Sequence, residues 1–195
     1  MKIESLCLGE LSTNCYLVEL ACGLIVIDPA EPSSALLAAI ADRPVALVLN
    51  THGHFDHVGG NWVLQRRGAR VAIHPSDVPF LDHSYPDHPL VNRHLADGEQ
   101  VVPGITATAT PGHSPGSMVF AAEGVIFCGD LLFAGSIGRT DLPGGSMSAM
   151  RTSLQWLLRL PDDTQVYPGH GPPTTIGRER TANPYLQGLD VDHRD

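Results

Sequence analysis

The fold is decided by the stretch Thr51-His52-Gly53-His54-Phe55-Asp56-His57-Val58-Gly59-Gly60, which holds three histidines and one aspartate within six positions. It directly follows the apolar run Val45–Leu49, which Pro44 precedes and Asn50 ends. An apolar run of this length is typical of a strand that is buried on both faces. The ligand-type side chains therefore stand at the carboxyl end of a buried strand, where open α/β folds tend to place their sites.

The spacing within this stretch favours two metal positions. His52 and His54 are two residues apart, so they point the same way in extended chain. Asp56 and His57 are adjacent in a turn that enters a helix, so they point in different directions. The two pairs fit a single tetrahedral ion poorly. We therefore expect two neighbouring metal ions, each held by one pair here and completed from elsewhere in the chain. The alternative, a set of surface or helix-cap histidines, would require this dense pattern to arise by chance.

Length and charge limit the remaining possibilities. The 195 residues suffice for one full core, so we expect a single domain over residues 1–195. The net charge of −9 provides no basic stripe for phosphates, which argues against nucleic-acid partners and anionic membranes and leaves a small-molecule substrate. No apolar run approaches transmembrane length, and the amino terminus lacks the pattern of a signal peptide. We therefore expect a cytoplasmic protein.

The four cysteines are Cys7, Cys15, Cys22 and Cys128, and no two of them form a C-x-x-C pair. We interpret them as reduced, mostly buried thiols.

Strands and helices alternate along the chain in two similar halves. The patterns predict strands over Ile3–Leu8, Cys15–Leu20, Leu24–Ile27, Val45–Leu49, Val71–Ile73, Ile105–Thr110, Met118–Ala121, Val125–Cys128 and Gln165–Tyr167. They predict helices after Ser33, over Asn61–Arg67, after Ser146 and over Ile176–Leu186. Two sheets packed face to face with helices outside would bury the apolar face of every element.

Two segments need a separate interpretation. The helix after Ser146 carries an apolar stripe that follows the helical period and predicts a core face, at Met147, Met150, Leu154, Leu157 and Leu158. Residues 75–99 are rich in Pro, Asp and His and have weak periodicity, so we expect a long loop with a short helix. We interpret its His83, His88 and His94 as solvated loop residues, and we leave His74 outside the site.

Three further residues follow predicted strands in the same way as the central stretch: His113, Asp130 and His170. Each histidine comes after Pro-Gly, and Asp130 comes after Gly129. Glycine allows the backbone to turn sharply and to approach a metal or a substrate closely. The recurrence after three separate strands makes these residues candidate ligands.

These blocks together resemble metallo-β-lactamase-fold hydrolases, in particular the short bacterial relatives of hydroxyacylglutathione hydrolase (glyoxalase II). The matching blocks, which occur in family order, are Thr51–Gly60, Gly112-His113-Ser114, Gly129-Asp130, Gly138-Arg139-Thr140-Asp141 and Gly169-His170-Gly171. The resemblance implies an α/β fold of the four-layer αββα sandwich type with a two-metal site at one edge. It also implies the ligand sets: His52, His54 and His113 for one ion, Asp56, His57 and His170 for the other, and Asp130 bridging both.

The expected chemistry is metal-dependent hydrolysis. Three imidazoles suit Zn²⁺, while carboxylates make the second position more tolerant of Fe or Mn. A water shared by two metals exists as hydroxide near neutral pH, and we expect it to attack a polarised carbonyl while Asp56 orients it and receives its proton. A thiolate leaves with little protonation, so thioesters such as S-2-hydroxyacylglutathione fit better than amides.

The chain departs from full-length glyoxalase II enzymes at two points. It ends soon after His170, so we expect no carboxyl-terminal helical domain, which in those enzymes carries part of the glutathione site. Those enzymes also have a lysine and a tyrosine where Arg139 and Asp141 stand. Arg139 is either a fork that binds a substrate carboxylate or the partner of Asp141 in an internal ion pair.

Two other functions remain in view. The Gly138–Asp141 block also occurs in persulfide dioxygenases of this fold, which by resemblance would hold a single iron with His52, His113 and Asp130. The complete second ligand set favours hydrolysis over this oxidoreductase. A non-catalytic binding module is the third reading, and no substituted metal position supports it. Cys128 does not replace the aspartate that follows it.

Overall fold

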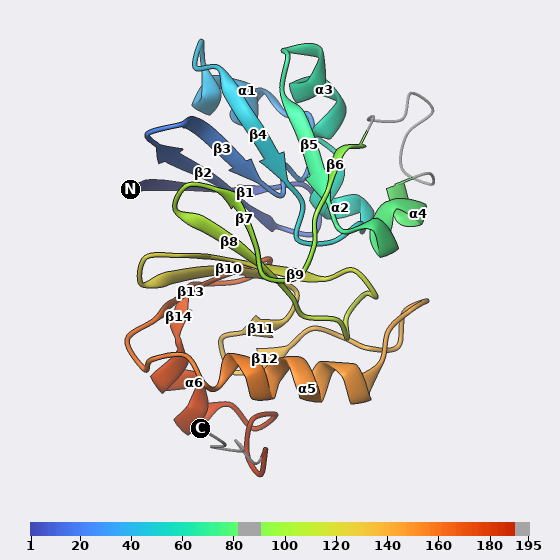
Figure 1. Ribbon diagram of the computed structural model, residues 1–195, viewed down its shortest axis with the longest axis vertical. Helices are drawn as coiled ribbons and strands as arrows, with labels where there is room; N and C mark the ends of the chain where they lie inside the picture. The colour runs from blue at the N-terminus through green and yellow to red at the C-terminus, as the bar shows by residue number, and fades with distance from the viewer. Residues whose placement is uncertain (82–90, 190–195) are drawn as a thin grey trace.

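Six strands from the first half of the chain form one sheet in sequence order. They are β1 (Lys2–Leu8), β2 (Thr13–Leu20), β3 (Gly23–Ile27), β4 (Val45–Leu49), β5 (Arg70–Ile73) and β6 (Val91–His94). The first three strands are antiparallel, and β3 to β6 run parallel. The computed structural model describes residues 1–81 and 91–189 (Figure 1).

The second half of the chain forms a second six-stranded sheet, with the strand order β14-β13-β10-β9-β8-β7. Its strands are β7 (Glu99–Val102), β8 (Ile105–Ala109), β9 (Met118–Ala122), β10 (Val125–Gly129), β13 (Gln165–Pro168) and β14 (Thr174–Thr175). A two-stranded hairpin, β11 (Leu132–Phe133) with β12 (Ser136–Ile137), follows β10. Among the described residues of this sheet, β10 and β13 form the only parallel pair, and the other neighbouring strands are antiparallel.

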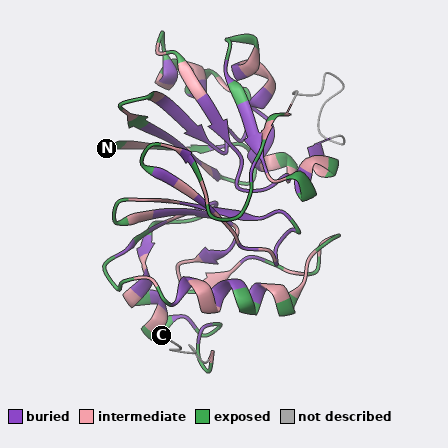
Figure 2. Cartoon of the chain, viewed as in Figure 1, coloured by how far each residue is buried: buried purple, intermediate pink, exposed green. Residues whose placement is uncertain are grey.

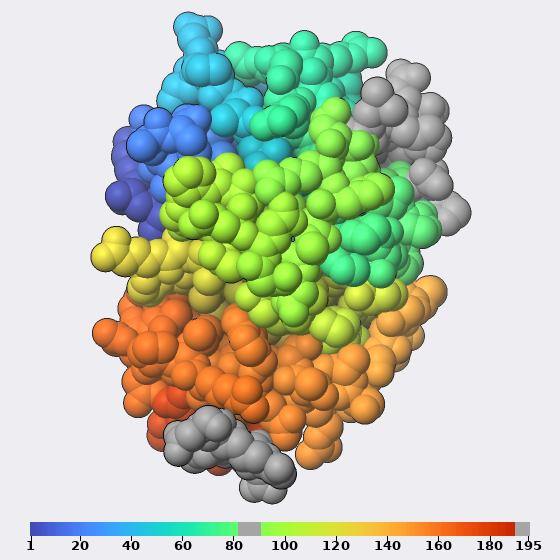
Figure 3. Space-filling view, in the orientation of Figure 1, coloured from blue at the N-terminus to red at the C-terminus, as the bar shows by residue number. Residues whose placement is uncertain are grey.

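The described residues form six α-helices and one 3-10 turn. They are α1 (Ser34–Ile40), α2 (Phe55–Val58), α3 (Asn61–Arg66), the 3-10 turn η1 (Pro75–Asp77), α4 (Val78–Leu81), α5 (Met147–Leu157) and α6 (Ile176–Ala182). Helices α1 and α3 lie on the first sheet, and α5 and α6 lie on the second (Figure 1). The order of layers confirms the predicted αββα sandwich. In the space-filling view the blue-to-cyan and orange parts of the chain lie at opposite ends, with β7 and β8 between them (Figure 3).

The core has three layers because the strand side chains alternate. In β3, Leu24 and Val26 pack toward α1 and α3, while Ile25 and Ile27 pack toward the second sheet. All four are buried. Figure 2 shows that the strands between the two helical layers are coloured largely as buried. Burial of one such side chain contributes about 1.5–3 kcal/mol relative to exposure. The inner strands therefore form a firm base for the loops that leave their carboxyl ends. A third apolar cluster joins the second sheet to α5.

The prediction for residues 75–99 was wrong in part. The short helix is present as η1 and α4, but the segment also contains β6 and the start of β7. In β6 the residues alternate between half-buried and exposed, so an edge strand carries little of the apolar signal that identifies inner strands. His83 and His88 lie outside the described residues, and His94 is exposed.

Three smaller predictions also need correction. Helix α6 ends at Ala182 instead of Leu186, since Asn183 precedes a proline and adopts an extended conformation. Met147 is exposed at the start of α5, while the rest of the predicted stripe is buried. All four thiols are free, but Cys7 and Cys22 are exposed. Within the described residues, no helix is both long and apolar enough to cross a membrane.

Candidate metal centre

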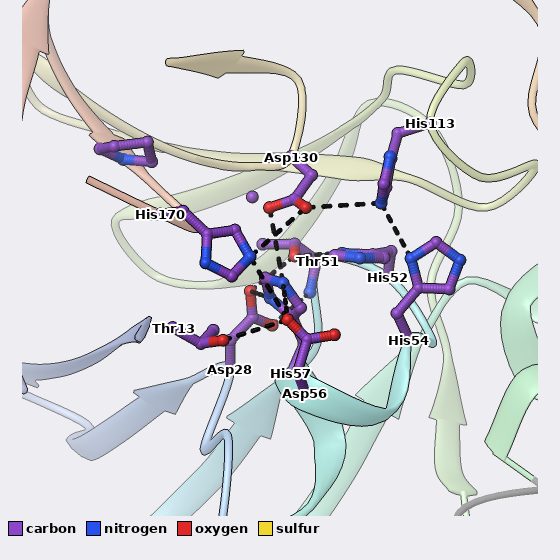
Figure 4. Close-up of polar contacts among 12 residues, drawn as sticks. Thr13, Asp28, Thr51, His52, His54, Asp56, His57, His113, Asp130 and His170 are labelled. Atoms are coloured by element: carbon purple, nitrogen blue, oxygen red, sulfur yellow. Dashed lines mark hydrogen bonds and ion pairs between the residues drawn. The ribbon is translucent and has the colours of Figure 1, made fainter. Parts of the chain in front are cut away.

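The seven predicted ligands meet at one edge of the sandwich, where strands of both sheets end (Figure 4). In the first sheet, β3 and β4 are parallel and pair Ile27 with Leu49, so the histidine stretch leaves β4 at that edge. In the second sheet, parallel β10 and β13 pair Gly129 with Pro168. Parallel pairing therefore brings Asp130 and His170 out side by side, facing the first sheet.

The first group consists of His52, His54 and His113, whose ligand atoms lie within 4.8 Å of one another. Nδ1 of His54 is 2.8 Å from Nε2 of His113. The ring of His52 is 4.7 Å from that of His54 and 4.8 Å from that of His113, centroid to centroid. Three imidazole nitrogens thus converge on one point, although His113 comes from the other sheet.

The second group consists of Asp56, His57 and His170, and its ligand atoms lie within the same 4.8 Å limit. Oδ2 of Asp56 is 3.4 Å from Nε2 of His57 and 3.3 Å from Nε2 of His170. Asp56 and His57 are both in the short helix α2, and His54 caps its amino end. The turn predicted to separate the two ligand pairs is therefore a helical one.

Asp130 lies between the two groups (Figure 4). Its Oδ1 is 3.4 Å from Nε2 of His57, on the second group. Its Oδ2 is 3.5 Å from Nε2 of His113 and 3.6 Å from Nε2 of His170. One carboxylate thus faces both groups, which is the arrangement that a bridging ligand requires.

Three buried atoms at this centre have no hydrogen-bond partner among the described residues: His52 Nε2, His57 Nε2 and Asp130 Oδ1. Buried polar atoms without a partner are costly and rare in folded proteins. Imidazole nitrogen and carboxylate oxygen are ligands for zinc and related ions. The backbone also comes close here, since a Cβ on Gly169 would lie 2.2 Å from Asp130 Oδ1. The residues therefore fit two metal ions.

In His113 and His170, the ring nitrogen that faces away from the centre is held by a backbone carbonyl oxygen. Nδ1 of His113 lies 2.8 Å from the carbonyl oxygen of Arg139, and Nδ1 of His170 lies 3.1 Å from that of Leu11. A carbonyl oxygen only accepts, so each Nδ1 carries the proton and donates it. In the neutral form of either ring, Nε2 then carries the lone pair, and this lone pair is directed at the centre.

Asp28 and Thr51 hold the rings of His57 and His52, and the sequence did not single out Asp28 and Thr51 as functional. Oδ2 of Asp28 accepts a hydrogen bond of 2.6 Å from the Thr51 hydroxyl and lies 2.9 Å from Nδ1 of His57. Because the Thr51 hydroxyl donates to Asp28, its oxygen accepts from Nδ1 of His52 at 3.0 Å. Asp28 directly follows β3, just as the candidate ligands follow other strands. This position was the signal by which the sequence could have identified Asp28. Asp28, His52 and His57 form a third group of side chains that could hold a metal ion. The oxygens of Asp28, however, already accept hydrogen bonds from the backbone and hydroxyl of Thr51 and contact Nδ1 of His57.

The two groups differ in their protonation. Burial, and then the charge of neighbouring imidazoles, lowers the pKa of His52 well below its ordinary value. The pKa of His54 is lowered for the same reasons. Burial also acts against the charged form of His57, but Asp130, Asp28 and Asp56 outweigh it and raise its pKa to about 9.

The carboxylate of the second group is anionic. Burial opposes its charge, but the hydrogen bond with His170 and the charge of His57 outweigh burial and lower the pKa of Asp56. The same hydrogen bond raises the pKa of His170. The Thr13 hydroxyl donates to Oδ2 of Asp56 at 3.1 Å and fixes the carboxylate further.

A cavity of about 440 Å³ opens over both groups. Its lining combines apolar and ligand residues: Leu11, His54, Phe55, Asp56, Phe80, His113, Asp130, Arg139, Leu142, Pro143 and His170. Leu11 and Phe55 are more than half exposed and stand at its rim. The centre is thus reachable by a small molecule through an apolar mouth.

Arg139 lines this cavity and is paired with Asp141. Its guanidinium donates to both carboxylate oxygens, at 2.7 and 2.8 Å, and both side chains are exposed. The hydrogen bond from Arg139 lowers the pKa of Asp141 to about 2. The internal ion pair therefore forms in this structure, at a place where a substrate would pass.

Two nearby residues stand apart from the ligand groups. His74 accepts a hydrogen bond from the backbone of Ser76 at the start of η1. Cys128 donates to the carbonyl oxygen of Leu132, and burial raises the pKa of its thiol to about 12. A thiol that keeps its proton is a poor metal ligand.

Known proteins resemble this chain over most of its length. The family model of the metallo-beta-lactamase superfamily matches residues 8–170. The hydroxyacylglutathione hydrolase GloC of Haemophilus influenzae is 34% identical over 208 aligned residues, covering 95% of this chain and 98% of that protein.

Two solved structures are also similar. TTHA1623 in a di-iron-bound form has a TM-score of 0.88 and 40% identity, covering 94% of this chain and 100% of that one. ETHE1 from Myxococcus xanthus has a TM-score of 0.80 and 31% identity, covering 96% of this chain and 85% of that one.

Proposed function

Because the chain belongs to the metallo-beta-lactamase superfamily, we propose that it is a metal-dependent hydrolase that cleaves thioesters such as S-2-hydroxyacylglutathione. The observation that carries the proposal is that Asp130 faces two complete ligand groups. A single ion held by His52, His113 and Asp130 would make no use of the second group. The likeness to the hydroxyacylglutathione hydrolase GloC supports the choice of substrate class.

We assign two divalent ions to the centre, with Zn²⁺ as the first candidate. His52, His54 and His113 would hold one ion, Asp56, His57 and His170 the other, and Asp130 both. The carboxylates of the second group make Fe or Mn an alternative there, and the di-iron form of TTHA1623 supports iron. When bound, such ions supply Lewis acidity toward a carbonyl oxygen and lower the pKa of a water molecule.

Asp56 is the residue that we assign to proton transfer. Its carboxylate lines the cavity and is anionic at neutral pH, so it can accept a proton from an attacking water. Thr13 and His170 hold its Oδ2, which fixes the direction of the side chain. A thiolate leaving group needs little protonation, because its pKa of about 8.5 is close to ambient pH. This suits a cavity whose lining, apart from the proposed ligands and Arg139, is apolar.

Arg139 is the proposed contact for an anionic part of the substrate. Its guanidinium is already engaged by Asp141, so a substrate carboxylate would have to replace that partner. Exposed ion pairs are weak, which makes such an exchange feasible. The apolar residues Phe55, Phe80 and Leu142 would contact the uncharged part of the substrate and exclude water around it.

A persulfide dioxygenase with one iron is the second candidate. The Gly138–Asp141 block and the 31% identity with ETHE1 favour it. The deciding experiment measures metal content, thioester cleavage and oxygen uptake on one sample. We expect two ions per chain and thiol release without oxygen uptake. One iron per chain with persulfide-dependent oxygen uptake would replace the hydrolase proposal.

Replacement of Asp130 tests the two-ion centre. Asp130→Ala removes the carboxylate that faces both groups, so we expect the ions at both positions and the thioesterase activity to be lost. Elemental analysis and a thiol-release assay measure the two effects. A variant that keeps two ions and full turnover would refute the assignment.

We also propose a location for the protein in the cell. We place the protein in the cytoplasm, and the four free thiols support a reducing environment.

A further inference from the structure

Asp77 is a fully buried carboxylate that belongs to neither ligand group. It lies in η1, after β5, and all its side-chain hydrogen bonds leave its own segment. Oδ2 accepts from the backbone N–H of Gly53 at 2.8 Å and from the hydroxyl of Ser114 at 2.6 Å. Oδ1 accepts from the N–H of Gly116 at 2.6 Å. The charge is thus balanced by three donors in a place that water does not reach.

These donors lie on the two loops that carry the first ligand group. Gly53 stands between His52 and His54, and Ser114 directly follows His113. The two loops come from different sheets, and His54 and His113 are 59 positions apart. One oxygen of Asp77 accepts from both loops and so links them close to the ligands.

The backbone is shaped around this carboxylate. A Cβ on Gly53 would lie 2.5 Å from the carbonyl oxygen of Asp77, and a Cβ on Gly116 would lie 2.6 Å from its Oδ1. Ser114 is held in turn, since its hydroxyl is 2.7 Å from that of Ser117 and its N–H donates to Ser117 at 3.1 Å. The close fit leaves the two loops little freedom to move relative to each other at this point.

We propose that Asp77 is a positioning residue that sets the separation between the His52–His54 segment and His113, and thereby the affinity and coordination geometry of the first metal position. The inference rests on the proposed two-ion centre but not on its substrate. Ligand geometry governs metal affinity, and groups that orient ligands typically change it by about 10–100-fold when removed. The second group has no hydrogen bond with Asp77 among the described residues and should respond little.

The test compares Asp77→Asn with a matched control, Glu179→Gln. Asparagine keeps the size of Asp77 but turns one acceptor oxygen into a donor that faces another donor. Glu179 is also a fully buried carboxylate, and it accepts from the Thr174 hydroxyl, the N–H of Gly135 and the side chain of Asn183. Its amide variant creates the same mismatch away from the histidine loops. Ser114→Ala removes one donor and leaves the carboxylate in place, which serves if Asp77→Asn does not fold.

The readout is Co²⁺ binding to metal-stripped protein, followed by visible absorption and by competition with a chelator. In Asp77→Asn we expect one of the two Co²⁺ ions to bind about 10–100-fold more weakly, with an altered absorption spectrum, while the other binds as in the parent chain. Ser114→Ala should shift the same ion in the same direction by a smaller factor. Glu179→Gln should bind both ions like the parent, even where its melting temperature falls equally.

Equal Co²⁺ affinities and spectra in Asp77→Asn and Glu179→Gln would overturn the proposal. So would an unchanged Ser114→Ala if Asp77→Asn does not fold. The outcome is independent of the proposed function, because Co²⁺ binding requires no turnover. A parent chain that binds two ions without cleaving thioesters would refute the thioesterase while the comparison still decides the role of Asp77. If the parent binds a single ion, the two-ion centre fails, and the same comparison is made on that ion.

Discussion

The two ligand groups of the centre lie side by side but differ in charge. The first consists of imidazoles alone, and burial keeps His52 and His54 neutral. The second contains a carboxylate, and the pKa of its His57 is raised to about 9. His57 faces Asp28 and Asp130, whereas His52 has other imidazoles around it. One position is therefore ready for an ion at neutral pH, and the other must first lose protons.

The largest effect should come from a change that strikes both groups at once. In Gly169→Ala the new methyl group would lie 2.2 Å from Asp130 Oδ1 and 2.7 Å from a ring carbon of His57. Asp130 must then move away from both groups. We expect both ions to bind more weakly and thioester turnover to fall by about 100-fold or more, as misplaced ligands typically cause. Elemental analysis and kcat measurement provide the check.

Gly188→Ala is the control for this variant: its methyl group would meet no described atom within 4 Å, and the backbone strain of an alanine at the φ of +74° is confined to a turn outside the ligand groups. It should retain both ions and the parent activity. If Gly169→Ala keeps both ions at parent affinity, Asp130 is not the shared element of the two groups.

The pH dependence of metal binding should separate the groups. An ion binds the neutral imidazole, so below pH 9 it must displace the proton of His57. Affinity at the second position should therefore fall at least about tenfold for each unit of pH decrease, because the pKa of His170 is raised as well. A histidine with a lowered pKa shows no such dependence near neutral pH, because its neutral form already predominates and no proton has to be displaced. The pKa of His52 is lowered, so the first position should stay nearly constant until pH falls below the ordinary histidine value of 6.5.

Competition titrations with Zn²⁺ between pH 9 and pH 6.5 measure both slopes. The release of protons on binding, measured in weakly buffered solution, gives a second reading of the same difference. Equal slopes at the two positions would contradict the comparison.

The smallest effect should come from a side chain that belongs to neither group. Arg139 supports His113 only through its backbone carbonyl, so Arg139→Ala should leave both metal affinities and kcat unchanged. We expect KM for a glutathione thioester to rise by less than about tenfold, because an exposed charge contributes modestly. Asp141→Ala frees the guanidinium and should lower the same KM. An unchanged KM in both variants would leave Arg139 with no role in substrate binding.

The main features of the fold and the candidate ligands were predictable because their signals are local. The apolar runs of β3 and β4 report burial directly, and the residues that follow β4, β10 and β13 stand next to strands that the sequence predicts. The edge strand β6 was missed because its side chains are half-buried or exposed and carry little pattern. Helix α6 was predicted too long, although Pro184 marks its end.

What the sequence alone determined is the set of side chains able to hold metal, since the type and spacing of histidines and aspartates reflect their chemistry. Tertiary structure alone decided how these side chains are held and charged. Asp77 carries no local signal and Asp28 only its place after β3, and both act through contacts with residues 23 to 39 positions away. The difference between the two groups has the same origin. A pKa depends on which charges lie near in space, and only the folded chain brings Asp28 and Asp130 to His57.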